Sequence, residues 1–223
     1  MCFSAAASFT AAAVLTGTGS ASVNIARRRQ LGLGMTLFAA FPLLFGLQQF
    51  SEGVVWLGVY GITPSWLTAI GTALFVFAAY VMWPILGPLV GWLIEPEGTR
   101  KRIFAVFLAA GLAVGGYLAY AAIAHPQVPI QSHQWGGHLA YLNDFAYLPR
   151  IEILYFLTAS IPLLLSSNRT AVMFAAVLSA AFVATWLTYD VKVLPSVWCF
   201  YAAIGSAVVL LGLWMEERRE AAA

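Results

Sequence analysis

Long apolar runs, separated by short polar or charged stretches, make up most of this chain. Seven of the runs approach the roughly 20 residues that a helix needs to cross the hydrocarbon core of a bilayer. The pattern predicts a single all-α domain, a bundle of seven transmembrane helices with one long connection at residues 125–149. The expected helices lie at about residues 4–26, 31–59, 65–93, 103–124, 150–165, 170–189 and 196–215.

The composition favours the same class of protein. Hydrophobic residues make up 61% of the 223 positions and charged residues only 9%, with a mean hydropathy of +0.85. Soluble domains carry about 25% charged residues. A soluble core could not bury so much apolar surface, so we expect a lipid bilayer as the main partner. The net charge of +2 is small and scattered, which excludes nucleic acid as a partner.

Helix packing and helix breaks are also visible in the pattern. The first expected helix is rich in small and hydroxyl residues, which favour contact with other helices over contact with lipid. Gly111 and Gly115 form a small-xxx-small pair that allows a close helix crossing. Pro42, Pro84 and Pro88 predict kinks in the second and third helices.

Lys and Arg residues predict the orientation in the membrane. If every expected helix spans, nine of the 11 fall on one side, and only Arg150 and Lys192 fall on the other. The positive-inside rule makes the side with nine cytoplasmic, so we expect the N-terminus outside and the C-terminus inside. The nine are Arg27, Arg28, Arg29, Arg100, Lys101, Arg102, Arg169, Arg218 and Arg219.

A carboxylate interrupts the second apolar run. On a helix, Gln48, Glu52 and Trp56 share one face at i, i+4 and i+8, with Gln49 beside them. An ionisable group at membrane depth is costly and normally faces the bundle interior, where it is a functional-site candidate. No basic residue is expected at the depth of Glu52. A buried hydrogen-bond network explains this group as well as a substrate site does.

The expected orientation places several other unusual residues in the same outer half. Cys199 lies about one turn into the last helix, beside Trp198. Glu152 follows Arg150 at a helix start, where an ion pair and the helix dipole account for it, and Asp190 with Lys192 is typical of an interfacial pair. We predict an outward-facing polar cavity for a small molecule or a metal ion. Its expected lining is Gln48, Gln49, Glu52, Trp56, Trp198 and Cys199.

The three histidines suggest a metal site. His125, His133 and His138 all fall in the long connection. The spacing of the last two is not the i, i+4 spacing of a helical zinc site, although Gly136 and Gly137 give the backbone the freedom to chelate from a loop. A transition metal is therefore one interpretation. The other is a solvated loop that happens to contain three histidines.

Both cysteines are expected on the outer side, which is oxidising in many compartments. A disulfide between Cys2 and Cys199 would attach the N-terminus to the last helix. Two unpaired thiols, or thiolate ligands for a soft metal, fit the sequence equally well.

Three stretches resemble a family of bacterial multi-pass membrane proteins that is classed as a domain of unknown function. The stretches are Met1–Phe9, Pro42–Leu57 and Pro195–Phe200. The resemblance implies an integral protein of the bacterial plasma (inner) membrane. It implies no reaction, cofactor or catalytic residue.

Three functions stay open at this point. The first is a binding or catalytic membrane protein with a small molecule or metal at the Glu52 site. The second is a transporter or channel that uses Glu52 to handle protons or cations, against which the weakly polar inner half of the bundle counts. The third is a structural or sensory protein that acts through a separate protein partner. The chain has no Ser/His/Asp set at suggestive spacing, no phosphate-binding glycine loop and no CxxCH haem motif. Whether any reaction is catalysed stays open.

Overall fold

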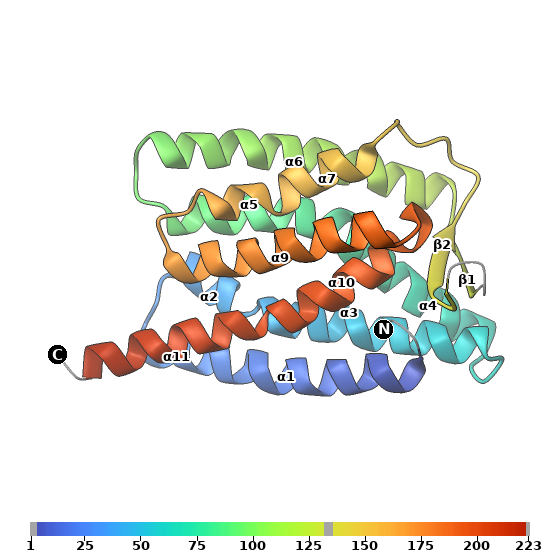
Figure 1. Ribbon diagram of the computed structural model, residues 1–223, viewed down its shortest axis with the longest axis horizontal. Helices are drawn as coiled ribbons and strands as arrows, with labels where there is room; N and C mark the ends of the chain where they lie inside the picture. The colour runs from blue at the N-terminus through green and yellow to red at the C-terminus, as the bar shows by residue number, and fades with distance from the viewer. Residues whose placement is uncertain (1–3, 132–135, 222–223) are drawn as a thin grey trace.

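The computed structural model describes residues 4–131 and 136–221, and most of them are helical. The helices lie along one long axis, and the chain runs back and forth along it (Figure 1). The helices are α1 (Ala5–Arg28), α2 (Leu33–Ala39), α3 (Phe41–Val59), α4 (Ser65–Val76), α5 (Trp83–Ile94), α6 (Thr99–Ala124), α7 (Ile151–Ala159), α8 (Ile161–Leu164), α9 (Arg169–Thr188), α10 (Leu194–Gly205) and α11 (Ala207–Ala221). A π-helix, η1 (Phe77–Met82), joins α4 to α5, and a 3-10 turn, η3 (Val191–Val193), precedes α10.

Five helical segments of the described chain are long and apolar enough to cross a membrane. The expected helical class is therefore confirmed, with these five as candidate spans. The first expected helix, α1, has 24 residues but is not among the five, because its hydroxyl and glycine residues dilute its apolar character. The fifth is interrupted at Ser160, which leaves the short helices α7 and α8. The five segments are Leu33–Val59, Ser65–Ile94, Thr99–Ala124, Arg169–Thr188 and Val191–Arg219.

Proline explains most of the breaks within these segments. It has no backbone N–H and fits the first turn of a helix. Pro42 lies in the first turn of α3, just after the break at Ala40, and Pro162 lies in the first turn of α8. Pro84 likewise lies in the first turn of α5, which follows the π-helix η1 directly. Pro88 is accommodated inside α5 without ending the helix.

Glycine lets two helix pairs approach closely. A Cβ on Gly111 of α6 would lie 1.9 Å from the carbonyl oxygen of Pro84 in the first turn of α5. A Cβ on Gly19 of α1 would lie 2.5 Å from the backbone nitrogen of Leu43 in α3. Any larger residue would force these backbones apart, so the expected close crossing at Gly111 is confirmed.

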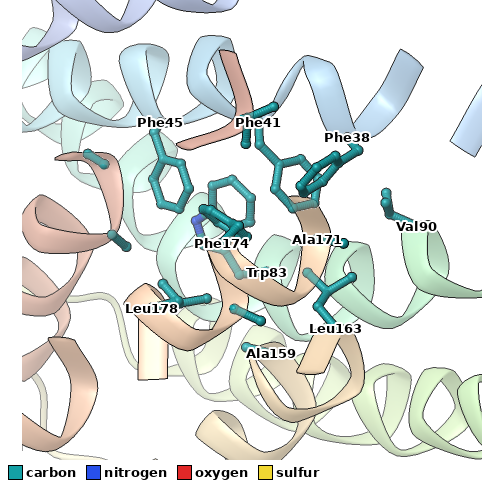
Figure 2. Packing of buried hydrophobic residues seen from close by; sticks show 14 of the residues in the cluster. Phe38, Phe41, Phe45, Trp83, Val90, Ala159, Leu163, Ala171, Phe174 and Leu178 are labelled. Atoms are coloured by element: carbon teal, nitrogen blue, oxygen red, sulfur yellow. The ribbon is translucent and has the colours of Figure 1, made fainter. Parts of the chain in front are cut away.

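Aromatic rings fill the interior near the end of the bundle that carries α2. We call Phe38, Phe41, Phe45, Trp83 and Phe174 the aromatic cluster; their rings turn toward one another (Figure 2). Phe45 stacks on Trp83 with 4.0 Å between ring centroids, and Phe41 meets Trp83 edge-on at 5.4 Å. Such contacts add about 0.5–1.5 kcal/mol each beyond burial alone. The cluster ties α2, α3, α5 and α9 together.

A short β-hairpin occupies part of the long connection that was expected to be a loop. Strands β1 (Val128–Gln131) and β2 (Leu139–Leu142) pair in antiparallel register, with Val128 opposite Leu142. Tyr141 of β2 stacks on Phe75 of α4 at 4.5 Å, which fixes the hairpin against the bundle. We call this end of the molecule the hairpin end (Figure 1).

The opposite end, which we call the basic end, collects the Arg-rich connections. Here α1 ends, α6 and α9 begin, and α11 ends (Figure 1). Arg28 lies 3.2 Å from Glu217, so the end of α1 is paired with the end of α11. Buried Glu95 accepts hydrogen bonds from the Ser166 hydroxyl (2.7 Å) and the Ser167 N–H (2.6 Å), which anchors the end of α5 to the α8–α9 connection.

Candidate functional site

The polar face of α3 points into the bundle, as the sequence pattern predicted. Gln48, Gln49, Glu52 and Trp56 are each at most 1% exposed. The hydroxyl of Ser196 in α10, also fully buried, donates a hydrogen bond to Oε1 of Glu52. A carboxyl group in apolar surroundings requires such partners, so this contact joins α3 to α10.

Gln48 connects the same face to a third helix. Its Oε1 accepts a hydrogen bond of 2.8 Å from the indole N–H of Trp83 in α5. The side chain of Gln48 also lies against the Cys199 thiol of α10. The next residue is different, because neither polar atom of the Gln49 amide has a hydrogen-bond partner among the described residues. We call Gln48, Gln49, Glu52 and Ser196 the buried polar layer.

A cavity of about 370 Å³ lies beside this layer, toward the hairpin end. We call it the hairpin-end cavity. The residues that line it come from α6, η1, α7, α9, α10 and the connections at this end, with exposed Leu148, Val191 and Lys192 at its rim. Its lining is largely aromatic and aliphatic and includes Tyr80, Leu118, Tyr141, Phe145, Tyr147, Tyr155, Phe182, Trp198 and Cys199.

The structure divides the predicted cavity residues into two groups. Trp198 and Cys199 line the hairpin-end cavity, whereas Gln48, Gln49, Glu52 and Trp56 do not. Ser196 and Cys199 lie one turn apart on the same face of α10. Ser196 contacts Glu52, and Cys199 lies against Gln48 and lines the cavity. The expected polar cavity is therefore an apolar cavity with a polar layer behind its wall, a distinction that the spacing of residues in the sequence does not contain.

A π-helical turn builds one side of the cavity. The Tyr155 hydroxyl donates a hydrogen bond of 2.5 Å to the carbonyl oxygen of Ala79, inside η1. A π-turn disturbs the regular helical hydrogen-bond ladder, and such turns are frequent at functional sites. Tyr80 of the same turn borders the cavity. The sequence analysis did not identify either tyrosine as a site residue. The local signal for the π-helical turn was the Trp83-Pro84 step that follows it.

Two charged side chains belong to the cavity wall near its mouth. Glu152, in the first turn of α7, is 15% exposed and lies 3.7 Å from Arg150, as the expected ion pair required. Lys192 lies on the other side, in η3. Asp190 caps this turn, because its carboxylate accepts the Lys192 backbone N–H at 2.9 Å. The mouth thus offers one carboxylate and one ammonium group above apolar walls.

The two histidines that the structure describes, His125 and His138, do not come together. His125 ends α6, and its Nδ1 lies 2.6 Å from Asp144. His138 is buried beside Tyr189 at the other end of the hairpin, where Gln131 pairs with Leu139. His133 lies outside the described residues. Among those that are described, no group of three His, Cys, Asp or Glu side chains could hold a metal ion.

The predicted disulfide involves one residue that the structure describes. Cys199 is buried, 2% exposed, forms no disulfide with a described residue, and lines the hairpin-end cavity. Cys2 lies outside the described residues.

The geometry defines a helical protein with several helices that fit a membrane and with an internal cavity beside a buried polar layer. A model of the family of unknown function DUF6629 matches residues 1–223, and the chain belongs to that family. No curated protein and no solved structure matches the chain. The membership therefore supports the unknown-function resemblance and assigns no reaction.

The Ser196–Glu52 contact predicts how Glu52 variants behave. Glu52→Gln keeps the volume and an oxygen that accepts the Ser196 hydroxyl, so we expect its free energy of unfolding to change by less than about 1 kcal/mol. Glu52→Leu removes this acceptor and should cost about 1–3 kcal/mol. Denaturant unfolding in detergent measures both variants. In a Ser196→Ala background the cost of Glu52→Leu should fall. An equal loss of unfolding free energy in Glu52→Gln and Glu52→Leu would contradict a stabilising Ser196–Glu52 hydrogen bond.

The His125–Asp144 contact predicts a pH dependence at the hairpin end. The hydrogen bond from His125, a backbone hydrogen bond and the charge of His125 lower the pKa of Asp144 below its ordinary value of 3.8. A carboxyl with a lowered pKa stabilises the folded state above that ordinary value, and this contribution is lost as the pH falls through the folded pKa. The difference in unfolding temperature between wild type and Asp144→Asn should therefore be present at neutral pH and shrink only below pH 3.8, as the pH falls through the folded pKa. In a His125→Asn background it should be much smaller at every pH.

Proposed function

We propose that the protein is an integral membrane protein of seven spans that binds a small, mainly apolar molecule from outside. The hairpin-end cavity is the binding site. Its volume of about 370 Å³ lies within the 300–1,000 Å³ of typical ligand pockets, which are lined by apolar side chains with a few polar groups. The observation that carries this proposal is that the cavity begins at the hairpin end and stops at Trp198 and Cys199.

Two further segments complete the seven spans. Helix α1 has 24 residues, about 36 Å at 1.5 Å per residue, which exceeds the roughly 30 Å of a hydrocarbon core. Its buried hydroxyl residues, Ser8 and Ser22, suit a helix that packs on neighbours. Helices α7 and α8 run beside α5, α6 and α9 (Figure 1). Ser160, at the break between them, is fully buried. Backbone breaks at membrane depth are tolerated where other helices cover them.

Charge supports an orientation with the hairpin end outside. The Arg-rich stretches at residues 27–29, 100–102 and 218–219, with Arg169, belong to the basic end, whereas Arg150 and Lys192 belong to the hairpin end. The positive-inside rule then makes the basic end cytoplasmic. The plasma membrane of a bacterium is the proposed location, because residues 1–9, 42–57 and 195–200 resemble bacterial multi-pass membrane proteins.

The aromatic cluster favours binding over transport. Below Trp198 and Cys199 lies a void of only about 10 Å³, bordered by Phe41, Phe45 and Trp83 of the cluster. A water molecule needs at least about 10–15 Å³ and two or more polar partners. The described residues that line this void are all apolar or aromatic except Cys199, so a bound molecule would leave by the way it entered.

The lining suggests the chemistry of the ligand. Rings of Phe145, Phe182 and Trp198 would contact an apolar or aromatic body. A polar end of the same molecule would lie toward the mouth, near Glu152 and Lys192. This arrangement fits an amphipathic molecule of modest size better than an ion.

A photoreactive aryl diazirine with a benzyl alcohol tail tests the proposal in purified protein. We expect it to label the peptides that carry Tyr80, Tyr147 and Tyr155. Excess benzyl alcohol should suppress this labelling, because it competes with the probe for the same cavity. Leu118→Trp fills the cavity from α6 and should reduce the labelling at least tenfold. Mass spectrometry of the labelled peptides gives the readout.

Leu112→Trp is the matched control for Leu118→Trp. Leu112 lies on the same helix but is 53% exposed and does not line the cavity, so labelling of the cavity peptides should persist in this variant. Leu118→Phe provides a smaller filling residue if the tryptophan disturbs folding. Labelling that benzyl alcohol does not suppress, or that Leu118→Trp and Leu118→Phe leave unchanged, would overturn the binding-site proposal.

A further inference from the structure

A second hollow lies on the outer surface of the bundle, between α4, η1 and α6. Its volume is about 610 Å³, and the start of β1 closes it at the hairpin end. It shares no lining residue with the hairpin-end cavity. We call it the α4–α6 groove. Both helical segments that border it, Ser65–Ile94 and Thr99–Ala124, are among the five that fit a membrane span.

The polarity of the groove changes along its length. Near the hairpin end it is lined by Thr63, Ser65 and Thr68 and by Gln127. Farther along α4 and η1 the lining becomes apolar, with residues such as Phe77. A hollow that is polar at the membrane interface and apolar toward the membrane centre matches the polarity of a phospholipid.

Two buried polar atoms of this groove have no hydrogen-bond partner among the described residues. One is the hydroxyl oxygen of Thr72, a residue that is 7% exposed. The other is Oε1 of Gln127, whose Nε2 donates to the Tyr147 hydroxyl at 2.8 Å and so fixes the amide. Buried polar groups in proteins almost always have partners, either protein or ordered water. A ligand in the groove with a hydrogen-bond acceptor and a donor would supply partners for both atoms.

The surroundings of the groove indicate that this ligand comes from the membrane. Ile123, which lines the groove, is 81% exposed, and Phe77 is 57% exposed. Large exposed apolar side chains on candidate membrane helices are typical of a lipid-facing surface. Along the helix, Thr68 to Val81 spans 13 residues, or about 20 Å, compared with about 15 Å for the hydrocarbon of one leaflet. The groove is therefore long enough for one acyl chain.

We propose that the α4–α6 groove binds one phospholipid from the leaflet at the hairpin end. Its acyl chain lies along α4 and η1, an ester carbonyl accepts a hydrogen bond from Thr72, and a headgroup N–H or O–H donates to Gln127. Phosphatidylethanolamine has such a donor, and phosphatidylcholine has none. This proposal rests on the membrane placement above but not on the hairpin-end cavity.

Native mass spectrometry of the detergent-solubilised protein tests this site with two lipids of identical palmitoyl and oleoyl chains. We expect one phosphatidylethanolamine per protein to be retained, and phosphatidylcholine to be retained more weakly. Thr72→Val removes one hydroxyl at nearly constant volume, so retention should fall about threefold to tenfold, as for one hydrogen bond. Equal retention of both lipids, or unchanged retention in Thr72→Val, would contradict the proposed hydrogen bonds.

Two matched variants of α6 test the position of the site. Ala119→Phe places a ring in the groove, whereas Ala113→Phe places the same ring on an exposed part of the same helix. Only Ala119→Phe should abolish retention, and Leu118→Trp, which fills the other cavity, should leave it unchanged. Equal retention in Ala119→Phe and Ala113→Phe would overturn the proposal. A dimer that is lost in Ala119→Phe would overturn it in favour of a second protein copy in the groove.

Discussion

The hydrogen bond from Ser196 to Glu52 is the contact on which the arrangement of the interior depends. A carboxyl group inside an apolar bundle requires a partner from another helix, because neither lipid nor aliphatic side chains provide one. This requirement brings α10 against α3, and the Trp83–Gln48 hydrogen bond brings α5 against the same face. One turn along the same face of α10, Cys199 lies against Gln48 and lines the hairpin-end cavity.

The interior therefore has two halves with different roles. Toward the hairpin end, the π-turn η1 and the Tyr155–Ala79 hydrogen bond leave an aromatic cavity open between the helices. Toward the basic end, the stacked rings of Phe45 and Trp83 fill the space. Between the two halves, the buried polar layer holds the helices in register. This division of the interior is the basis of the proposed binding from the hairpin end.

The sequence predicted the helical class because long apolar runs with few charges have one physical solution in lipid. It also identified the inward face of Glu52, since a carboxylate at that depth cannot face acyl chains. It did not predict which residues line the cavity, because the rotation of α10 depends on tertiary contacts such as Ser196–Glu52. Nor did it reveal the hairpin or the π-turn. Residues 125–149 have a weak strand pattern, and a π-turn depends on packing around Trp83-Pro84 rather than on residue spacing.

Thiol labelling in sided vesicles is the most direct test of an interior that opens outward and is closed below. The chain has two cysteines, so Cys2→Ser leaves Cys199 at the cavity floor as the sole thiol. A small, membrane-impermeant methanethiosulfonate should modify Cys199 in right-side-out vesicles and leave it unmodified in inside-out vesicles. Modification from the cytoplasmic side at an equal or greater rate would contradict the account.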